Sequence, residues 1–326
     1  MPVISMREAL NQALREEMTR DPNVFIMGED IGVFEGSYKV TACLFHEFGE
    51  KRVIDTPIVE ELMVGAGIGA AMLGLRPIVE IMTINFILLA MDQVVNHAAK
   101  LGYMFGGGVR VPLTIRTPGG GGQQLTAQHS QSLEVYFAHI PGLKVVAPAT
   151  PKDAKGMLKA AIRDDNPVLF IENISLYNVR GEVPDEEYLL PLNKAEVKRE
   201  GTDITLVGHS KGTLLALEAA RRLAEEDGIE AEVVDLRSLR PLDRETVLES
   251  VKKTSRAVLV EEGWPTYGIT AEVSASVMEG AFDYLDAPVV RVGGKEVPMP
   301  YSKPLENAVI PSVEGVVKAV RRIFGE

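Results

Sequence analysis

Ile54-Asp55-Thr56-Pro57-Ile58-Val59-Glu60, with the glycine-laced apolar run from Leu62 to Leu75, decides how the first part of this chain folds. Thr56 suits an N-cap and Pro57 suits the first helical position, so the stretch predicts a helix with Glu60 one turn in. The neighbours of Glu60 are too hydrophobic for solvent, so its carboxylate is either functional or paired in a buried site. A simpler alternative is that it complements the helix dipole.

The composition is that of a globular protein with two ordinary domains, because 46% of the 326 residues are hydrophobic. The net charge of −12 repels phosphate backbones and anionic membrane surfaces, so we expect neither nucleic acid nor a membrane as partner. A single cysteine cannot form an internal disulfide, which is typical of a reducing compartment. The first residues lack the features of a targeting segment, so a prokaryotic cytoplasm is the simplest location.

Helix and strand signals alternate from the beginning of the chain. Ser5-x-x-Glu8 is a capping box that predicts a helix to about Arg20. The apolar runs that follow predict strands at 24–27, 52–54, 77–81, 112–116, 144–147 and 168–172. Helices are predicted near 41–48, 86–104, 132–139 and 151–163, besides the glycine-rich one. Fully apolar strands separated by helices indicate a mostly parallel sheet that is covered on both faces.

Residues 173–202 interrupt this alternation with prolines, glycines and charges, which makes them the best linker candidate. The same α/β alternation then resumes, with strands at 204–208, 232–236, 257–261 and 288–292, and helices at 213–226, 243–252, 269–281 and 313–324. The sequence therefore predicts an α/β protein of two domains. A doubly wound, mostly parallel domain occupies residues 1–180, a linker 181–201, and a smaller α/β domain 202–326.

Two glycine motifs invite a nucleotide-binding interpretation. Gly65 to Ala70 satisfies the loose G-x-G-x-x-A pattern, but these glycines fall inside a predicted helix, where they allow close packing, instead of between a strand and a helix. Pro118 to Gly122 could cradle a phosphate with backbone N–H groups but lacks the residues of a Walker loop. We interpret it as a mobile entrance loop, a gate for substrate or for a partner's carrier arm.

The histidines show neither HExxH spacing nor a Cys/His cluster, so a zinc site is unsupported. His129 differs from the others because it lies in a polar, irregular segment between a glycine loop and a helix, where catalytic groups tend to be presented. The remaining four are expected to be structural, although His209 ends a predicted strand and could face a cleft.

Four motifs, in order, carry a resemblance to a known family: Asp55-Thr56-Pro57-Ile58-x-Glu60, Glu80-Ile81-Met82-Thr83-x-Asn85-Phe86, Ala127-Gln128-His129-Ser130-Gln131 and Pro141-Gly142-Leu143-Lys144-Val145-Val146. Together they closely resemble the beta subunits of the thiamine-diphosphate-dependent pyruvate dehydrogenase component, in the transketolase-like superfamily. The likeness runs nearly end to end. It implies a domain that binds the thiamine pyrimidine, followed by a transketolase C-terminal-like domain.

The resemblance also assigns roles to individual residues. It implies that Glu60 holds or shares a proton with the pyrimidine N1′, which an apolar setting favours because desolvation disfavours a charged carboxylate. It places Phe86 against the aminopyrimidine ring and Tyr103 in the lining of the same pocket. His129 becomes the histidine of the active centre, which donates or steers protons during addition to the 2-oxo group and during acyl transfer to a lipoyl arm.

A cation site is predicted where a helix ends before Pro167. The last carbonyls of that helix lack partners and, with the side chains of Asp164 and Asn166, form a plausible hard-cation site, although a plain C-terminal turn needs the same residue types. The resemblance implies K⁺ or a similar monovalent cation in a structural role. The implied ligands are Leu113, Ala161, Ile162, Asp164 and Asn166.

The chain contains no Gly-Asp-Gly triplet, the motif with which the family holds the diphosphate and Mg²⁺. The resemblance therefore implies that an alpha subunit supplies that half of the site, in an assembly of two alpha with two beta chains. It further implies a lipoyl domain and a dihydrolipoamide acetyltransferase core as partners.

Pyruvate is the expected substrate, because three short segments resemble pyruvate-specific beta chains. These are Tyr38-Lys39-Val40, Glu262-Gly263-Trp264-Pro265 and Met299-Pro300-Tyr301. Branched-chain 2-oxo acids and acetoin stay open as alternatives, because the alpha chain contributes much of the substrate pocket. Two other classes also stay open: a stand-alone nicotinamide-dependent dehydrogenase and a non-catalytic interaction module.

Overall fold

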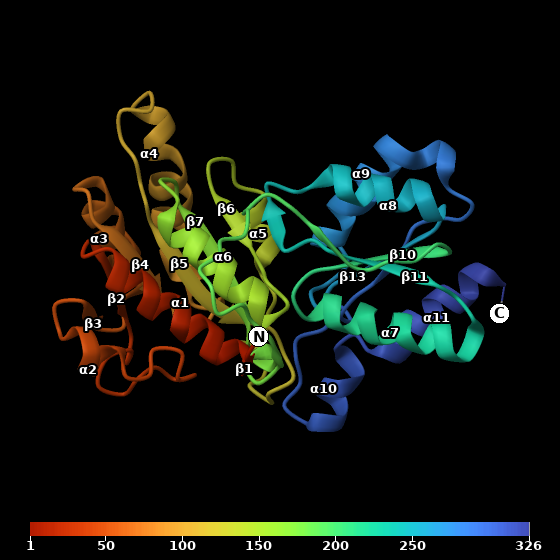
Figure 1. The fold of residues 1–326 in the computed structure, drawn as a ribbon, viewed down its shortest axis with the longest axis horizontal. Coiled ribbons are helices and arrows are strands. Elements are labelled where there is room, and N and C mark those ends of the chain that lie inside the picture. Colours follow the sequence, from red (N-terminus) through yellow and green to blue (C-terminus); the bar gives the residue numbers. More distant parts are fainter. Residues whose placement is uncertain (326) are drawn as a thin grey trace. The chain divides into compact units, whose positions relative to one another are not determined.

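The computed structural model describes residues 1–325 and divides into two compact units. Unit 1 contains residues 1–119 and 136–192. Unit 2 contains residues 120–135 and the chain from Asn193 onward. Each unit has its own sheet with helices beside it, as Figure 1 shows, so the predicted two-domain α/β fold is confirmed.

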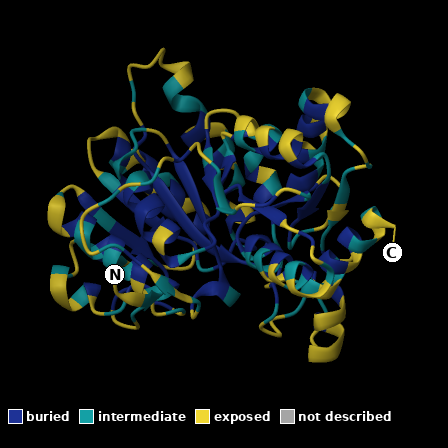
Figure 2. Ribbon diagram, turned by 45° about the vertical axis from the view of Figure 1, so that its right-hand side comes forward, coloured by how far each residue is buried: buried dark blue, intermediate teal, exposed yellow. Residues whose placement is uncertain are grey.

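Unit 1 is built on parallel strands in the order β6-β7-β5-β4-β2-β3. The strands are β2 (Val24–Gly28), β3 (Val53–Asp55), β4 (Arg76–Glu80), β5 (Thr114–Gly119), β6 (Lys144–Val146) and β7 (Val168–Asn173). Their side chains are almost all buried, as expected for a parallel sheet covered on both faces. Figure 2 shows the strands in the buried colour and most exposed residues on helices and loops.

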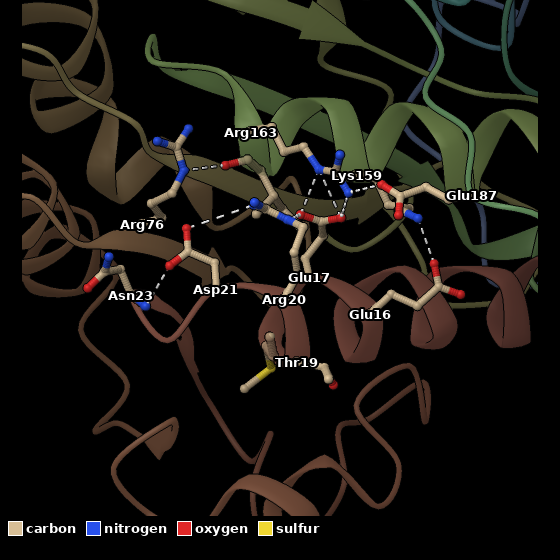
Figure 3. A network of polar contacts seen from close by, with 12 residues as sticks. Glu16, Glu17, Thr19, Arg20, Asp21, Asn23, Arg76, Lys159, Arg163 and Glu187 are labelled. Atoms are coloured by element: carbon tan, nitrogen blue, oxygen red, sulfur yellow. Dashed lines mark hydrogen bonds and ion pairs between the residues drawn. The ribbon is translucent and has the colours of Figure 1, made fainter.

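The two long helices of unit 1, α1 (Met6–Arg20) and α6 (Pro151–Arg163), were both predicted, and α1 begins with the predicted capping box. Ser5 forms the capping box of α1, because its hydroxyl accepts from the Glu8 N–H at 3.2 Å while its own N–H donates to Glu8 at 2.7 Å. The buried Glu17 joins the two helices: it accepts from Arg20 at 2.7 Å and from Arg163 at 2.6 Å (Figure 3).

Helix α3 (Glu60–Met72) starts later than predicted. Thr56 is not its N-cap, because the Thr56 N–H donates to the Gly28 carbonyl at 2.9 Å and so stays extended beside β2. Val59 is the N-cap, and Glu60 is the first helical residue instead of lying one turn in. The prediction that glycine allows close packing is confirmed at Gly67, where a Cβ would lie 2.7 Å from Val79 Cγ2.

The helix predicted near residues 86–104 is confirmed in its extent, because residues 87–104 are helical throughout, but it does not keep a single hydrogen-bond register. The segment divides into the 3₁₀ turn η1 (Ile87–Ala90), the π-helical η2 (Gln93–Ala98) and the helix α4 (Ala99–Met104). The buried residues Ile87, Ala90, Val94 and Ala98 keep a helical spacing of three or four. Hydrophobic spacing therefore predicts a helix here, but it does not reveal a change in hydrogen-bond register.

Three other predicted segments of this part differ from the sequence expectation. The helices at 41–48 and 132–139 are shorter, as α2 (Leu44–Phe48) and α5 (Glu134–Ala138). The segment predicted as a linker holds two strands, β8 (Arg180–Glu182), which pairs antiparallel with β1 (Val3–Ser5), and β9 (Glu196–Arg199) of unit 2. The 3₁₀ turn η3 (Ile174–Leu176) follows β7.

Unit 2 has a sheet in the order β14-β13-β10-β11-β9, parallel except for β9. The strands are β10 (Ile204–Gly208), β11 (Ala231–Asp235), β13 (Ala257–Val260) and β14 (Val290–Val292), with β12 (Ser238–Arg240) between β11 and the next helix. The helices are α7 (Lys211–Asp227), α8 (Arg244–Thr254), α9 (Ile269–Ala281), α10 (Lys303–Val309) and α11 (Val313–Phe324), with the 3₁₀ turn η4 (Phe282–Tyr284) after α9. Among residues 1–325, no helix combines the length and the apolar character that crossing a membrane needs.

Candidate active site

Three buried carboxylates gather at the carboxyl ends of neighbouring strands in unit 1. Glu29 directly follows β2, Glu80 ends β4, and Glu60 begins the helix that follows β3. They are 5%, 7% and 4% exposed, respectively. We call these three residues the acidic edge. The carboxyl edge of an open parallel sheet is where α/β proteins bind ligands, so the local fold presents three carboxyl groups to such a site.

Glu29 carries the clearest electrostatic signal on the acidic edge. Burial raises its pKa above the ordinary value, and the nearby charges of Glu60, Asp30 and Glu80 raise it further. Its Oε1 atom is buried and has no hydrogen-bond partner among residues 1–325. An unpaired carboxyl beside a second buried carboxyl favours a shared proton and a ligand that donates to oxygen.

Glu80, in contrast, is paired with a buried arginine. The guanidinium of Arg116 contacts Glu80 and also binds Glu172 through two N–H groups, at 2.8 and 2.6 Å. Tyr177 donates its hydroxyl to Glu172 at 2.6 Å, and burial raises the pKa of that hydroxyl. Burial also raises the pKa of Glu80, although Arg116 opposes the shift. This network holds β4, β5 and β7 together under the acidic edge.

Sequence analysis identified Glu60 but missed Glu29. The available signal was its place directly after the apolar strand that ends at Gly28. Close packing explains that glycine, because a Cβ at Gly28 would lie 2.8 Å from the Glu80 carbonyl oxygen. The strand order that brings Glu29 beside Glu60 is β4-β2-β3, which local sequence does not specify.

Phe86 lies just after β4, on the turn that leads into η1. The turn is closed by the Phe86 N–H, which donates to Thr83 O at 2.9 Å, and by Asn85, which donates to Thr83 Oγ1 at 2.6 Å. The Phe86 ring is half-buried, so it offers an apolar surface next to the end of β4. Ile84 is fixed by its N–H, which donates to Pro118 O at 2.8 Å.

Tyr103 lies elsewhere in unit 1, near the end of α4. Its side chain is 89% exposed, and within residues 1–325 no hydrogen bond or ring contact links it to the acidic edge. It lines a surface cavity of about 490 Å³ together with Gly102, Arg110 and Asn166. Tyr103 therefore has an exposed position on α4, beside the cavity that it lines.

The predicted cation ligands lie at the end of α6, where cationic side chains already contact several of them. Arg76 donates to the carbonyl oxygens of Ile162 and Asp164 at 2.8 and 2.6 Å. The Asp164 carboxylate binds Lys144 and accepts from the Asn166 N–H at 2.9 Å. Burial alone would raise the Asp164 pKa, but the bonds from Lys144 and Asn166 lower it overall, so this group stays charged.

Two further carbonyls complete the predicted cation set. The Ala161 oxygen accepts from the Asp164 N–H at 3.2 Å, and the Leu113 oxygen accepts from the Val168 N–H at 2.9 Å. A carbonyl oxygen has two lone pairs, so each retains one that these bonds do not use. Within residues 1–325, no group of three or more His, Cys, Asp or Glu side chains is placed to hold a metal ion.

His129 belongs to the segment of unit 2 that follows the glycine loop. It is exposed, and its N–H donates to Thr126 O at 3.3 Å. The loop itself is closed by the Gly120 N–H, which donates to Gln131 O at 3.1 Å. An exposed imidazole on a hydrogen-bonded loop can reach a substrate, as a proton donor or acceptor must.

Glu134 starts α5, five positions after His129, and is buried beside two other carboxylates of unit 2. Burial raises its pKa to about 8, and the charges of Glu262 and Glu261 add to the shift. His209 is also buried, and burial lowers its pKa to about 4, so it is neutral at physiological pH. Glu134 and His209 therefore carry little charge near pH 7, although both are titratable.

Comparisons with known proteins agree over nearly the whole chain. Residues 3–180 match the family model of the transketolase pyrimidine binding domain, and residues 193–316 match that of the transketolase C-terminal domain. The pyruvate dehydrogenase E1 component subunit beta-1 of Arabidopsis thaliana is 50% identical over 98% of this chain and 89% of its own length. The pyruvate dehydrogenase E1 component subunit beta of Rhizobium meliloti is 51% identical over 99% of this chain and 70% of its own length.

A solved structure gives the same result for the fold. The chain is similar to a split-gene transketolase, described as an inactive beta4 tetramer, with a TM-score of 0.78 and 26% identity over 98% of both chains.

Proposed function

Because this chain belongs to the family of pyruvate dehydrogenase E1 beta subunits, we propose that Glu60 and His129 are its catalytic residues. Membership makes the chain part of a thiamine-diphosphate-dependent 2-oxo acid dehydrogenase that decarboxylates pyruvate. The observation that carries the proposal for Glu60 is its place on the acidic edge, 4% exposed and next to the unpaired Glu29.

The acidic edge fits the cofactor. A buried carboxyl oxygen without a partner among residues 1–325, beside a second buried carboxyl, suits a heterocycle whose ring nitrogen can be protonated. When bound, thiamine diphosphate supplies an acidic carbon and an electron sink for loss of CO₂. Phe86 would give the aminopyrimidine an apolar surface, and Tyr103 would line the same pocket in the assembled enzyme.

Glu60 holds a proton at the pyrimidine nitrogen N1′ in this proposal. A dry surrounding suits that task because a hydrogen bond to the ring nitrogen is stronger where water does not compete for it. Glu29 lies close to Glu60, and burial together with the charge of Glu60 raises the pKa of Glu29. His129 donates a proton to the substrate oxygen and steers protons during transfer of the acyl group to a lipoyl arm.

The partners follow from the incomplete site. The chain lacks a Gly-Asp-Gly motif, so an alpha subunit would hold the diphosphate and Mg²⁺, in a tetramer of two alpha with two beta chains. We further propose a lipoyl domain and a dihydrolipoamide acetyltransferase core as partners. The proposed location is a prokaryotic cytoplasm.

The proposed division of the chain is a pyrimidine-binding domain at residues 1–180, a linker at 181–201 and a C-terminal domain at 202–326. Residues 120–135 lie inside the proposed pyrimidine-binding domain in sequence. In the structure they belong to unit 2.

We propose a structural monovalent cation such as K⁺ at the end of α6. Its ligands would be the free lone pairs of Leu113, Ala161, Ile162, Asp164 and Asn166. Thermal unfolding in KCl and in choline chloride at equal ionic strength tests this. A higher melting temperature in KCl is expected, and equal values would argue against the site.

The function is tested by co-expressing the chain with an alpha subunit and adding thiamine diphosphate, Mg²⁺ and a lipoyl domain. A panel of pyruvate, branched-chain 2-oxo acids and acetoin then measures the specificity. We expect the highest kcat/KM with pyruvate. Binding of NAD by the isolated chain, with no decarboxylation by the pair, would instead support a nicotinamide-dependent dehydrogenase.

A further inference from the structure

The glycine loop before His129 is bound to two carboxylates of unit 2. The Gly121 N–H donates to Glu262 Oε1 at 2.9 Å. The N–H groups of Gly122 and Gln124 both donate to Glu306 Oε1, at 3.0 and 2.9 Å. Three backbone donors in four successive residues are therefore satisfied by side chains that lie far away in the sequence.

Each of these carboxylates is paired with a lysine. Lys211 binds Glu262 at 3.0 Å, and Lys303 binds Glu306 at 2.9 Å. Lys303 also donates to the Gly122 carbonyl at 2.7 Å, so this pair contacts the loop through both its members. We call these four residues the loop clamp.

The side chains of both clamp carboxylates are buried. The side chain of Glu306 is fully buried and that of Glu262 is 7% exposed. Burial alone would raise the Glu306 pKa, but the bonds from Lys303, Gln124 and Gly122 lower it overall. Hydrogen bonds from backbone N–H groups to a buried carboxylate are charge-assisted and short, so the clamp holds the loop firmly.

The clamped loop adopts backbone angles that need support. Gly122 has φ +98°, and the non-glycine residues Gln124 and Thr126 have φ 57° and 65°. Such angles disfavour L side chains and persist only where surrounding contacts determine them. The bonds to Glu306 on either side of residue 123 supply those contacts. A loop that opened as a gate would have to break them.

The two lysines come from differently built elements. Lys211 is the first residue of α7 and follows a tight turn at Ser210, whose φ is 49°. That turn has no spare room, because a Cβ at Gly208 would lie 2.7 Å from the backbone of Gly212. Lys303 is the first residue of α10, which also carries Glu306. One lysine of the clamp, Lys211, therefore lies on the long helix α7, and the other, Lys303, lies on the short helix α10.

We propose that Lys211, Glu262, Lys303 and Glu306 are positioning residues that fix His129 for catalysis. The link is short, since His129 donates its N–H to Thr126 O and Thr126 follows the clamped Gln124 by two positions. In this proposal the clamp acts on the histidine through the backbone. This inference rests on the proposed role of His129.

The test compares Glu306→Gln, Lys303→Met and His129→Ala with the unaltered chain, each assembled with the alpha subunit. Hydrogen exchange of the peptide covering residues 120–126 reads the loop directly and requires no turnover. We expect exchange to rise about tenfold or more in both clamp variants. Glu306→Gln replaces the charged acceptor of the Gly122 and Gln124 amides with a weaker neutral one, and Lys303→Met removes the cation that holds this acceptor and the Gly122 carbonyl. The kcat for acylation of the lipoyl domain should fall about 10- to 100-fold with a nearly unchanged KM for pyruvate.

Glu279→Gln is the matched control. Glu279 lies on α9, and its exposed carboxylate pairs with Arg244 of α8. It should change neither exchange nor kcat. Melting temperatures identify a variant that fails to fold. If Glu306→Gln fails to fold, Lys303→Met still tests the clamp.

The outcomes separate the two proposals. Unchanged exchange in both clamp variants would overturn the clamp, whatever the activity. Faster exchange with undiminished kcat would overturn the positioning role. If His129→Ala keeps full turnover while the clamp variants lose it, His129 is not catalytic and the clamp positions some other group of the loop.

Discussion

The acidic edge of unit 1 and the loop clamp of unit 2 both contain buried glutamates, but the two groups differ in how completely their carboxyl oxygens are paired. Both clamp carboxylates face a lysine and accept backbone N–H groups. Glu29 of the acidic edge has an oxygen without a partner among residues 1–325 and another carboxyl beside it. Complete pairing fixes a position, whereas incomplete pairing leaves a group that a ligand or a proton must satisfy.

Glu80 shows that the comparison holds within one unit. It lies on the acidic edge beside Glu29, but Arg116 binds it. The acidic edge therefore contains one carboxylate that is paired and supports the sheet, Glu80, and one carboxyl oxygen without a partner among residues 1–325, Glu29 Oε1. The predictions below test whether pairing, and not burial, separates structural from chemical roles.

The largest effect is expected from Glu60→Gln. The amide keeps the size of the side chain but cannot hold or release a proton, so turnover of the assembled enzyme should fall about 10³-fold or more. The melting temperature should change little, because the amide occupies the same buried space as the carboxyl. Steady-state kinetics with pyruvate and a thermal melt measure both. Retention of most activity would remove Glu60 from the mechanism.

Arg116→Met should give the largest loss of stability. The change leaves the buried carboxylates of Glu80 and Glu172 without their cation, which costs about 3–5 kcal/mol. Chemical denaturation measures the free energy of unfolding. Arg244→Met is the control, because that arginine pairs with Glu279 at the surface and its loss costs about 0–1 kcal/mol. Equal costs for the two variants would contradict the role given to burial and pairing.

Glu134 gives a pH-dependent effect of intermediate size. Burial raises its pKa in the folded chain to about 8, from 4.5. Between these values the unfolded chain loses the proton while the folded chain keeps it, so this group lowers stability as pH rises from about 4.5 to 8. Glu134→Gln removes that penalty.

The variant should match the unaltered chain near pH 4.5 and exceed its stability near pH 8, by roughly 2–4 kcal/mol. Denaturation series at the two pH values measure the difference. A constant difference across the range would show that Glu134 does not titrate with folding.

The smallest effect is expected from Lys159→Met on α6. Lys159 binds Glu16 on α1 at 2.7 Å, but Glu16 is half-exposed and also pairs with Lys155 at 2.8 Å. The second lysine keeps that carboxylate compensated, so the loss should be about 1 kcal/mol or less. A loss comparable to that of Arg116→Met would show that half-exposed pairs matter more than the comparison allows.

Local sequence predicts most of the fold because its signals act over a few residues. The capping box at Ser5 and the apolar strands each specify an element on their own. The error at Thr56 arose because a sheet hydrogen bond to Gly28 competes with capping. The change of register within the helical segment 87–104 was not predicted, because apolar spacing is similar in helices of different register.

Some residues of the candidate site could also be predicted from local sequence, and others could not. Glu60 could be inferred from its apolar neighbours, and His129 from its loop. The clamp could not be inferred, since Gly121 lies 141 positions from Glu262 and Gly122 lies 184 positions from Glu306. The loop was predicted to be a mobile gate because four glycines suggest freedom. Whether it opens in the assembled enzyme stays a prediction, which the bonds to the clamp make less favourable.

The insertion of residues 120–135 into unit 2 also limits how this chain can be dissected. The polypeptide passes from one unit to the other at 119/120, 135/136 and 192/193, so no single cut yields two self-sufficient fragments. A fragment that ends at residue 192 would contain His129 without Glu262 and Glu306. Modular exchange with a relative should therefore transplant the 120–135 stretch together with everything after residue 192.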